Sequence, residues 1–166
     1  MCSGKSGAGR VLARRLGLAF ADSDALAERR GGRTIREIAE SSGMAAFRRL
    51  ESACVRDLAA GSGRVAALGG GIYPVRRWRG ALKAGGVTVF LYCPWPELEK
   101  RLKKASGPRP LLSGPWEKAG PRAKKLYARR LPYYRRADIT VNTAGLTPAG
   151  TAAAIIEELK NENFQL

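Results

Sequence analysis

The sequence contains no histidine, few cysteines and few aromatic residues. Without histidine, it can form neither a Ser-His-Asp triad, nor a Cys-His pair, nor a histidine-based zinc site. The three cysteines, Cys2, Cys54 and Cys93, include no CxxC pair, so neither a thiolate metal site nor a disulfide framework is encoded. No hydrophobic run approaches the roughly 20 residues of a membrane-spanning helix, and no secretory segment is visible. We therefore expect a cytoplasmic protein without membrane contact.

Acidic residues are scarce relative to basic ones. The chain has 14 Asp and Glu against 30 Lys and Arg, which gives a formal net charge of +16. Such an excess favours anionic partners, namely nucleic acid, phosphates or small acids. The basic residues are spread over every segment with few aromatic residues among them, so we expect no nucleic acid partner. A basic nucleic-acid-binding module is kept as an alternative.

The hydrophobic pattern alternates between short strands and helices, and the length of 166 residues fits one domain. We expect helices at 8–16, 96–104, 122–131 and 147–161, three helical pieces within 25–60, strands at 18–21, 64–68, 87–92 and 138–142, and a loop rich in proline and glycine at 105–121. The three pieces are separated at Gly31-Gly32 and at Ser41-Ser42-Gly43. This alternation predicts an α/β fold in which helices flank a parallel sheet on both faces.

The first residues contain the end of a phosphate-binding loop. Gly4-Lys5-Ser6 matches the last part of the pattern GxxxxGK[ST], whose backbone N–H groups surround phosphate oxygens at the start of a helix. The first glycine of that pattern would stand five places before Gly4, ahead of Met1, and the strand that feeds such a loop is not in the sequence. Taken alone, these residues are more typical of a flexible Gly/Ser segment than of a phosphate-binding loop.

Further motifs follow along the whole chain. In order, they are Gly4-Lys5-Ser6-x-x-Gly9-Arg10, Asp22-x-Asp24, Gly43-x-x-x-Phe47-Arg48-x-x-Glu51, Gly69-Gly70-Gly71, Arg109-Pro110-Leu111-Leu112 and Arg130-x-Pro132-x-Tyr134. This succession resembles the shikimate kinase family, small P-loop enzymes of the nucleoside-monophosphate-kinase type. The resemblance implies the three-layer P-loop kinase architecture with its first strand missing, a single domain over 1–166, a substrate-binding helical segment at about 24–60 and a lid at about 105–121.

The resemblance also implies a reaction and a site. A monomer would transfer the γ-phosphoryl group of ATP, with Mg²⁺, to the 3-hydroxyl of shikimate. The implied catalytic residues are Lys5, Asp24 and Arg109. The implied shikimate-binding residues are Asp24, Arg48, Gly69, Gly70, Gly71 and Arg130. The implied nucleotide-binding residues are Gly4, Lys5, Ser6, Gly7, Arg101, Arg109 and Pro148, and the implied Mg²⁺ ligands are Ser6 and Asp22. Glu51, one helical turn after Arg48, could hold its guanidinium in place.

The sequence departs from the family pattern at three points. Gly7 stands where a hydroxyl residue is usual, which predicts weaker nucleotide binding, and Met44 stands where a glutamate is usual. The absent first strand would lie at the centre of the sheet, so its two neighbours would lose their ladder partners. A related kinase acting on gluconate and an inactive P-loop protein therefore remain alternatives.

Overall fold

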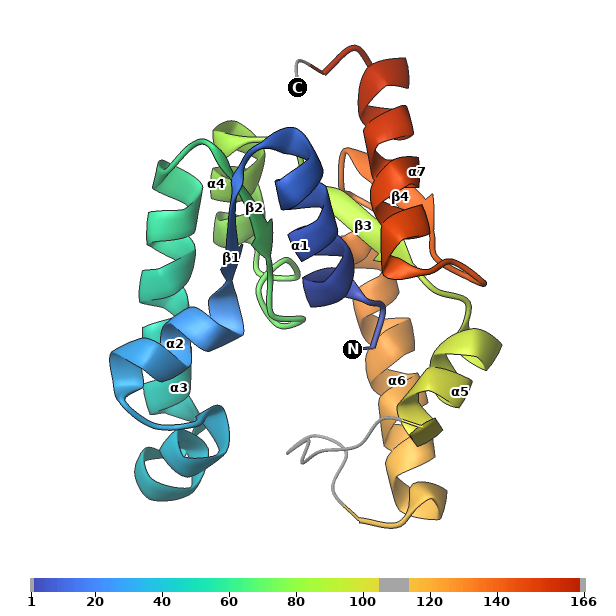
Figure 1. Cartoon of the computed structure of the whole chain (residues 1–166). Helices are drawn as coiled ribbons and strands as arrows, with labels where there is room; N and C mark the ends of the chain where they lie inside the picture. Colours follow the sequence, from blue (N-terminus) through green and yellow to red (C-terminus); the bar gives the residue numbers. More distant parts are fainter. Residues whose placement is uncertain (1, 105–113, 165–166) are drawn as a thin grey trace.

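The computed structural model describes residues 2–104 and 114–164. Its elements follow one another in the order α1 (Lys5–Leu16), β1 (Ala19–Asp22), α2 (Ser23–Gly31), α3 (Ile35–Ala60), β2 (Arg64–Ala67), α4 (Arg76–Gly85), β3 (Val89–Tyr92), α5 (Trp95–Lys104), α6 (Trp116–Tyr134), β4 (Ile139–Asn142) and α7 (Pro148–Asn161). Figure 1 shows α1 and α7 on one side of the strands, and α4 and α6 on the other. The predicted α/β class, with parallel strands between two helical layers, is confirmed.

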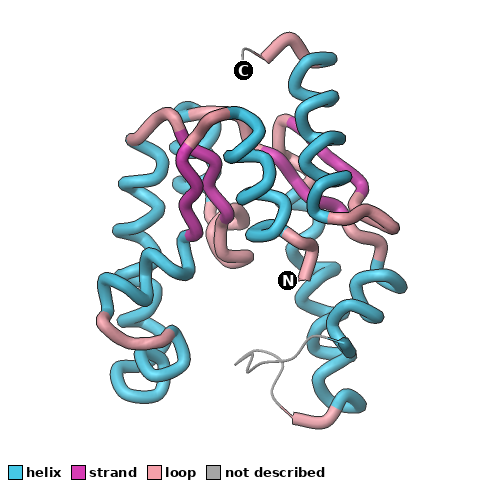
Figure 2. Tube along the Cα trace, in the orientation of Figure 1, coloured by secondary structure: helices cyan, strands magenta, loops and turns pink. Residues whose placement is uncertain are grey.

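The strands form two separate parallel pairs instead of one continuous sheet (Figure 2). β1 pairs with β2, with Ala19 opposite Arg64, and β3 pairs with β4, with Val89 opposite Ile139. Within residues 2–104 and 114–164, no strand lies between β2 and β3, and a cavity of about 400 Å³ lies there. The split agrees with a sheet that lacks its central strand.

Helices hold the two strand pairs together. The largest hydrophobic core lies where α1 and α7 pack on β3 and β4, and it includes the buried side chains of Leu12, Leu91, Val141 and Ile155. Helix α1 also packs against β1 and β2. Because α1 contacts both halves, burial of its apolar face substitutes for part of the missing ladder.

Local sequence signals account for the starts of α3 and α7. The Oγ1 of Thr34 accepts a hydrogen bond from the amide of Glu37, and the Glu37 carboxylate accepts one from the amide of Thr34, which together form a capping box. Thr147 caps α7 at the expected place, with Pro148 in the first turn. The break expected at Ser41-Ser42-Gly43 is present: Gly43 has non-helical angles (φ 76°, ψ 161°), and α3 consists of two helices that meet at this kink, so residues 25–60 hold the three expected helical pieces.

One expectation about the helices was wrong, and one helix was not predicted. Helix α6 begins at Trp116, so 116–121 is helical and not part of a loop. The Trp116 ring lies where a side chain on Gly120 would be, and Pro121 is accommodated inside the helix at the loss of one backbone hydrogen bond. Helix α4 was not predicted, because arginines and Gly80 interrupt its apolar pattern. The rest of the expected lid, 105–113 with Arg109, lies outside the described residues.

The packing of α4 on α3 can be tested with two glycines of α4. A methyl group at Gly85 would collide with the carbonyl oxygen of Ala59, whereas one at Gly80 would meet no atom within 4 Å. We expect Gly85→Ala to lower the free energy of unfolding by about 1–3 kcal/mol, since this close contact involves backbone. Gly80→Ala should raise it by about 0.5–1 kcal/mol. Urea unfolding followed by circular dichroism measures both, and equal stability of the two variants would contradict this packing.

Candidate active site

The phosphate loop leads directly into α1. Gly4 precedes the helix in a left-handed conformation (φ 86°), which glycine adopts without strain. No side chain caps this end, and the first turn carries no acidic residue, so the N–H groups of the first turn are open to an anion. The helix begins at Lys5, earlier than the expected start at 8, which places Lys5, Ser6 and Gly7 in its first turn. The loop therefore has the local geometry of an anion site.

Asp22, the last residue of β1, is hydrogen-bonded to Ser6 of this loop. The hydroxyl of Ser6 donates a hydrogen bond to Oδ2 of Asp22 at 2.6 Å, and Oδ1 of Asp22 accepts one from the amide of Asp24 at 3.0 Å. Asp22 thus caps α2 while its other oxygen contacts α1. Hydroxyl and carboxylate oxygens are ligands that suit Mg²⁺. The structure brings together the two residues expected to hold the metal.

The glycine triplet at 69–71, which follows β2, lies next to three of the other expected site residues, Asp24, Arg48 and Arg130. A Cβ atom on Gly69 would lie 2.7 Å from Oδ1 of Asp24, and one on Gly71 would lie 2.8 Å from Nη1 of Arg48. A Cβ atom on Gly70 would lie 3.1 Å from Nη1 of Arg130. Each glycine therefore faces a different functional side chain. The absence of three side chains leaves room for all of these groups.

Arg48 is held by its own helix. Its Nη1 donates to Oε2 of Glu51 at 2.5 Å, one turn further along α3, and its guanidinium lies 5.1 Å from the centre of the Phe47 ring. Glu51 is only 7% exposed, so this arginine balances a buried carboxylate. The predicted role of Glu51 in positioning Arg48 agrees with this geometry.

Two further residues, Ser23 and Tyr134, form hydrogen bonds with the backbone of the triplet. Neither was assigned a role from the sequence. The hydroxyl of Tyr134 donates to the carbonyl oxygen of Gly70 at 2.6 Å, and the amide of Gly69 donates to Oγ of the fully buried Ser23 at 2.8 Å. Burial raises the pKa of Tyr134, which keeps its hydroxyl a donor. Tyr134 stands four residues after Arg130 on α6, and this helical spacing was the signal that could have found it.

A cavity of about 420 Å³ opens beside the triplet. Besides Arg48, Glu51 and Gly71, its lining includes basic and aromatic residues from α4 and α6, namely Arg77, Trp78, Arg129, Arg130 and Tyr133. This volume suits a small molecule, and the surplus of guanidinium groups suits an acid.

The carboxyl group of Asp24 has a raised pKa. Burial raises its pKa above the ordinary value, and the neighbouring carboxylates of Asp22, Glu51 and Glu28 raise it further. The ammonium group of Lys5 acts in the opposite direction. A carboxylate with a raised pKa is a better proton acceptor than an ordinary one, as a group that binds a reacting hydroxyl should be.

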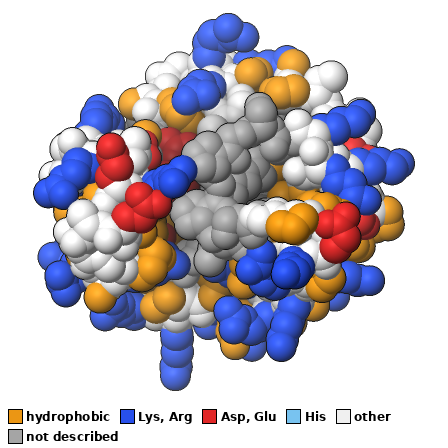
Figure 3. Space-filling model, turned by 90° about the horizontal axis from the view of Figure 1, so that it is seen from below, with side chains coloured by type: hydrophobic (Ala, Val, Ile, Leu, Met, Phe, Trp, Pro, Cys, Tyr) orange, Lys and Arg blue, Asp and Glu red, His pale blue; other side chains and the backbone are white. Residues whose placement is uncertain are grey.

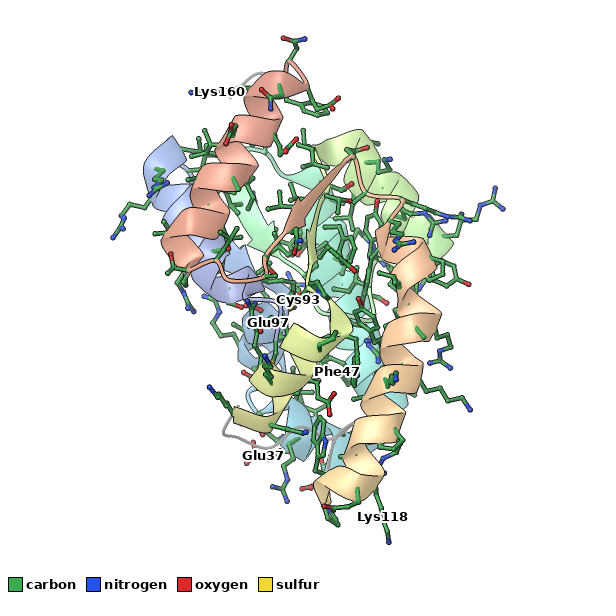
Figure 4. All side chains as sticks on the ribbon, turned by 90° about the vertical axis from the view of Figure 1, so that its right-hand side faces the viewer. Glu37, Phe47, Cys93, Glu97, Lys118 and Lys160 are labelled. Carbon is green, nitrogen blue, oxygen red and sulfur yellow. The ribbon has the colours of Figure 1, made fainter. Side chains whose placement is uncertain are left out.

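Two more of the residues expected to bind the nucleotide lie near the end of β4 and near the phosphate loop: Arg101 contacts Thr143, and Pro148 lies beside Gly7. Nη2 of Arg101 donates to the carbonyl oxygen of Thr143 at 2.7 Å, and its Nε donates to Glu97 at 3.1 Å. Figure 4 shows Glu97 on α5, close to the end of β3 at Cys93. A Cβ atom on Gly7 would lie 3.5 Å from the ring of Pro148, so the start of α7 borders the phosphate loop.

Comparisons with known proteins identify the family of the chain. The sequence model of the shikimate kinase family matches residues 1–160. The chain belongs to the shikimate kinase family. The shikimate kinase of Gloeobacter violaceus is 42% identical over 149 residues, which cover 90% of this chain and 82% of that protein. The shikimate kinase of Halorhodospira halophila is 40% identical over 163 residues, 98% of this chain and 90% of that protein.

Solved structures of shikimate kinases have the same fold. The enzyme from Acinetobacter baumannii, determined in complex with shikimate, superposes with a TM-score of 0.89 at 33% identity, over 99% of this chain and 91% of that one. The enzyme from Aquifex aeolicus gives a TM-score of 0.82 at 33% identity, over 98% and 94%. Shikimate kinases use ATP as a substrate. Among the described residues, no helix combines the length and apolar character needed to cross a membrane.

The raised pKa of Asp24 predicts a pH-dependent effect on stability. Between the ordinary carboxyl pKa and the raised value, the folded protein binds more protons than the unfolded chain, so the contribution of Asp24 to stability falls as pH rises through this window. Asp24→Asn removes that contribution. We therefore expect the free energy of unfolding of the variant, minus that of the original chain, to increase as pH rises through the same window. Urea unfolding at a series of pH values measures it.

Asp138 provides a control of opposite sign. Burial raises the pKa of this carboxyl, but hydrogen bonds from Lys83 and Thr88 outweigh burial and leave it lowered. Its contribution to stability is lost as pH falls through the lowered value, so the corresponding difference for Asp138→Asn should decrease as pH rises. Two differences of the same sign, or a flat difference for Asp24→Asn, would contradict these assignments.

Proposed function

We propose that this chain transfers the γ-phosphoryl group of ATP to the 3-hydroxyl of shikimate, and that it acts as a monomer. The observation that carries the proposal is the convergence of Asp24, Arg48 and Arg130 on one glycine triplet. Shikimate offers one carboxylate and three hydroxyls, so its site needs cations on one side and a hydrogen-bond acceptor on the other. The convergence supplies both within a single chain.

The two arginines bind the carboxylate in this proposal. Arg48 comes from α3 and Arg130 from α6, and both line the cavity of about 420 Å³. Guanidinium groups form paired hydrogen bonds with carboxylates, which fixes orientation as well as charge. Because Glu51 already holds Arg48, little side-chain freedom is lost when the substrate binds.

Asp24 orients the reacting hydroxyl. It accepts a hydrogen bond from the 3-hydroxyl, whose oxygen forms a bond to the γ-phosphorus while the bond between that phosphorus and the bridging oxygen of ADP breaks. The hydroxyl proton passes to Asp24 and then to solvent. Such transfers depend almost entirely on positioning and charge stabilisation, so the distance between Asp24 and the phosphate loop is decisive. The influence of Lys5 on the pKa of Asp24 supports their proximity.

The phosphates bind at the start of α1. The N–H groups of its first turn and the ammonium of Lys5 contact them, and Ser6 with Asp22 would hold Mg²⁺. When bound, Mg²⁺ neutralises charge on the phosphates. Arg101, Gly7 and Pro148 border the nucleotide, and Arg109 closes over it from the lid, a role inferred from the family resemblance alone.

The decisive experiment measures ADP formation by the purified chain with ATP and Mg²⁺. We expect ADP release that depends on shikimate and is lost when EDTA removes the metal. Gluconate serves as the competing substrate. Turnover with gluconate but not shikimate would replace the proposal by the related kinase, and no turnover with either would overturn it.

The alternative of nucleic acid binding is tested with the same purified protein. Lys and Arg side chains are dispersed around the face shown in Figure 3, where a nucleic-acid-binding module would show a continuous stripe. Oligonucleotide binding should therefore be weak and lost at moderate salt. Tight, salt-resistant binding would favour that alternative.

Two neighbouring arginines of α3 test the carboxylate contact. Arg48 lines the cavity, whereas the side chain of Arg49 is exposed and does not line it. We expect Arg48→Ala to raise the KM for shikimate by about 10- to 100-fold, the effect of losing a charge-assisted hydrogen bond. Arg49→Ala should leave it unchanged. Steady-state kinetics at saturating ATP measure both, and equal effects would show that overall charge, not the contact, attracts the substrate.

A further inference from the structure

The cavity of about 420 Å³ beside the glycine triplet lies on one side of the reacting groups. Its lining includes Gly71, which faces Arg48, but neither Gly69 nor Asp24, which face one another. In the proposed reaction the 3-hydroxyl of shikimate lies at Asp24 and the carboxylate at Arg48 and Arg130. The cavity therefore lies at the carboxylate end of the substrate, away from the reacting hydroxyl. We call it the arginine cavity.

Three arginines in the wall of the arginine cavity have no acidic partner. They are Arg77 of α4 and Arg129 and Arg130 of α6, and within the described residues none of them forms an ion pair. Glu51 is the only acidic residue in the described lining, and Arg48 already compensates its charge. A concave site lined by charges of one sign attracts ions of the opposite sign. One substrate carboxylate compensates a single charge, so this wall can bind a second anionic group.

The start of α4 adds backbone donors to the same wall. Pro74 and Val75, the two residues directly before the helix, line the cavity together with Arg77. No side chain caps this end of α4, and its first turn carries no acidic residue. The amides of the first turn and the positive end of the helix therefore act on an anion in the same direction as the Arg77 guanidinium.

Aromatic and aliphatic side chains form the rest of this wall. The guanidinium of Arg77 lies 4.7 Å from the centre of the Trp78 ring, so a cation and a flat apolar surface lie next to each other. Tyr133 is 39% exposed and Val75 is 40% exposed, and both line the cavity. Shikimate carries three hydroxyls around its ring, so it is a poor match for these surfaces. An aromatic ring matches them better.

We propose that the arginine cavity binds an aromatic dicarboxylate, which thereby excludes shikimate from its site. One carboxylate binds at Arg48 and Arg130, where the proposed function places the substrate carboxylate. The other binds at Arg77 and the start of α4, and the ring between them packs against Trp78 and Tyr133. The position of the first carboxylate rests on the proposed function, whereas that of the second does not. Such a ligand competes with shikimate and not with ATP.

Other small anions fit this cavity less well. Inorganic sulfate or phosphate would compensate the guanidinium groups but leave the rings of Trp78 and Tyr133 uncovered. An aromatic acid with one carboxylate would cover the rings but leave the Arg77 side of the cavity without an anion. Only a ligand with two carboxylates on an aromatic ring uses both kinds of surface.

Calorimetric titration with isophthalate, a benzene ring that carries two carboxylates, tests the site in the absence of ATP and shikimate. We expect saturable binding of one molecule per chain. Benzoate should bind at least about tenfold more weakly, because it leaves one charge-assisted contact unmade. The cyclohexane analogue with the same two carboxylates should bind about five- to tenfold more weakly, because it lacks the flat face. Absence of saturable isophthalate binding, or equal affinity for isophthalate, benzoate and sulfate, would overturn the proposal.

Two neighbouring arginines of α4 locate the second carboxylate. Arg77 lines the cavity, whereas Arg76 is exposed and does not line it. Arg77→Gln should weaken isophthalate binding at least about tenfold but benzoate binding less than about twofold, because benzoate needs only the other pair of arginines. Arg76→Gln should change neither, and an unchanged Tm checks that both variants fold. Equal effects of the two substitutions would show that overall charge attracts the ligand and would overturn the assignment.

Competition with the substrate tests the first carboxylate. In the ADP assay, isophthalate should raise the KM for shikimate but not that for ATP. If the chain phosphorylates shikimate and isophthalate binding is unaffected by it, the shared carboxylate position is wrong. The calorimetric titration needs no turnover, so the two proposals fail separately. An inactive chain that binds isophthalate as expected would contradict the proposed function alone, and an active chain that does not bind it would contradict this inference alone.

Discussion

The active-site geometry depends on the absence of side chains at three consecutive positions. Asp24, Arg48 and Arg130 come from α2, α3 and α6, and a Cβ atom on the triplet would lie 2.7 Å from the first, 2.8 Å from the second and 3.1 Å from the third. Any other residue there would require one of these side chains to shift. The short loop after β2 therefore sets the spacing between the Asp24 carboxylate and the guanidinium groups of Arg48 and Arg130.

The same convergence concentrates charge. The carboxylates of Asp22 and Glu51 lie close enough to Asp24 to raise its pKa. This acidic cluster stands in a chain that is strongly basic overall. The guanidinium of Arg48 compensates the charge of Glu51, and the Ser6 hydroxyl donates a hydrogen bond to Asp22. The charge of the buried Asp24 is less well compensated, so its pKa stays raised. In the proposed reaction Asp24 accepts the hydroxyl proton, and its burial makes the folded protein less stable than it could be, a common relation between activity and stability.

Much of this could be predicted from the sequence, for reasons that differ between elements. The capping box at Thr34 and the Thr147-Pro148 start are local, so they need no tertiary information. The site residues were recognised by the order of their motifs, and the structure brings those of the described region together. Helix α4 and the first turns of α6 were missed because glycine and proline normally interrupt helices. The structure explains two of these glycines: Gly85 packs closely against the carbonyl oxygen of Ala59, and the Trp116 ring lies where a side chain on Gly120 would be. Ser23 acts through the amide of Gly69, which no side-chain pattern reveals, whereas the spacing of Tyr134 from Arg130 on one helix could have revealed its role.

Parallel pairing has a kinetic consequence for this chain. Ala19 meets Arg64, and Val89 meets Ile139, only after the intervening helices have folded back across the strands. No hairpin can nucleate either pair, and loop-closure entropy opposes both before any ladder bond forms. Chain collapse must therefore precede strand registration, and the helical segments, which form locally and fast, set the order in which the two halves assemble.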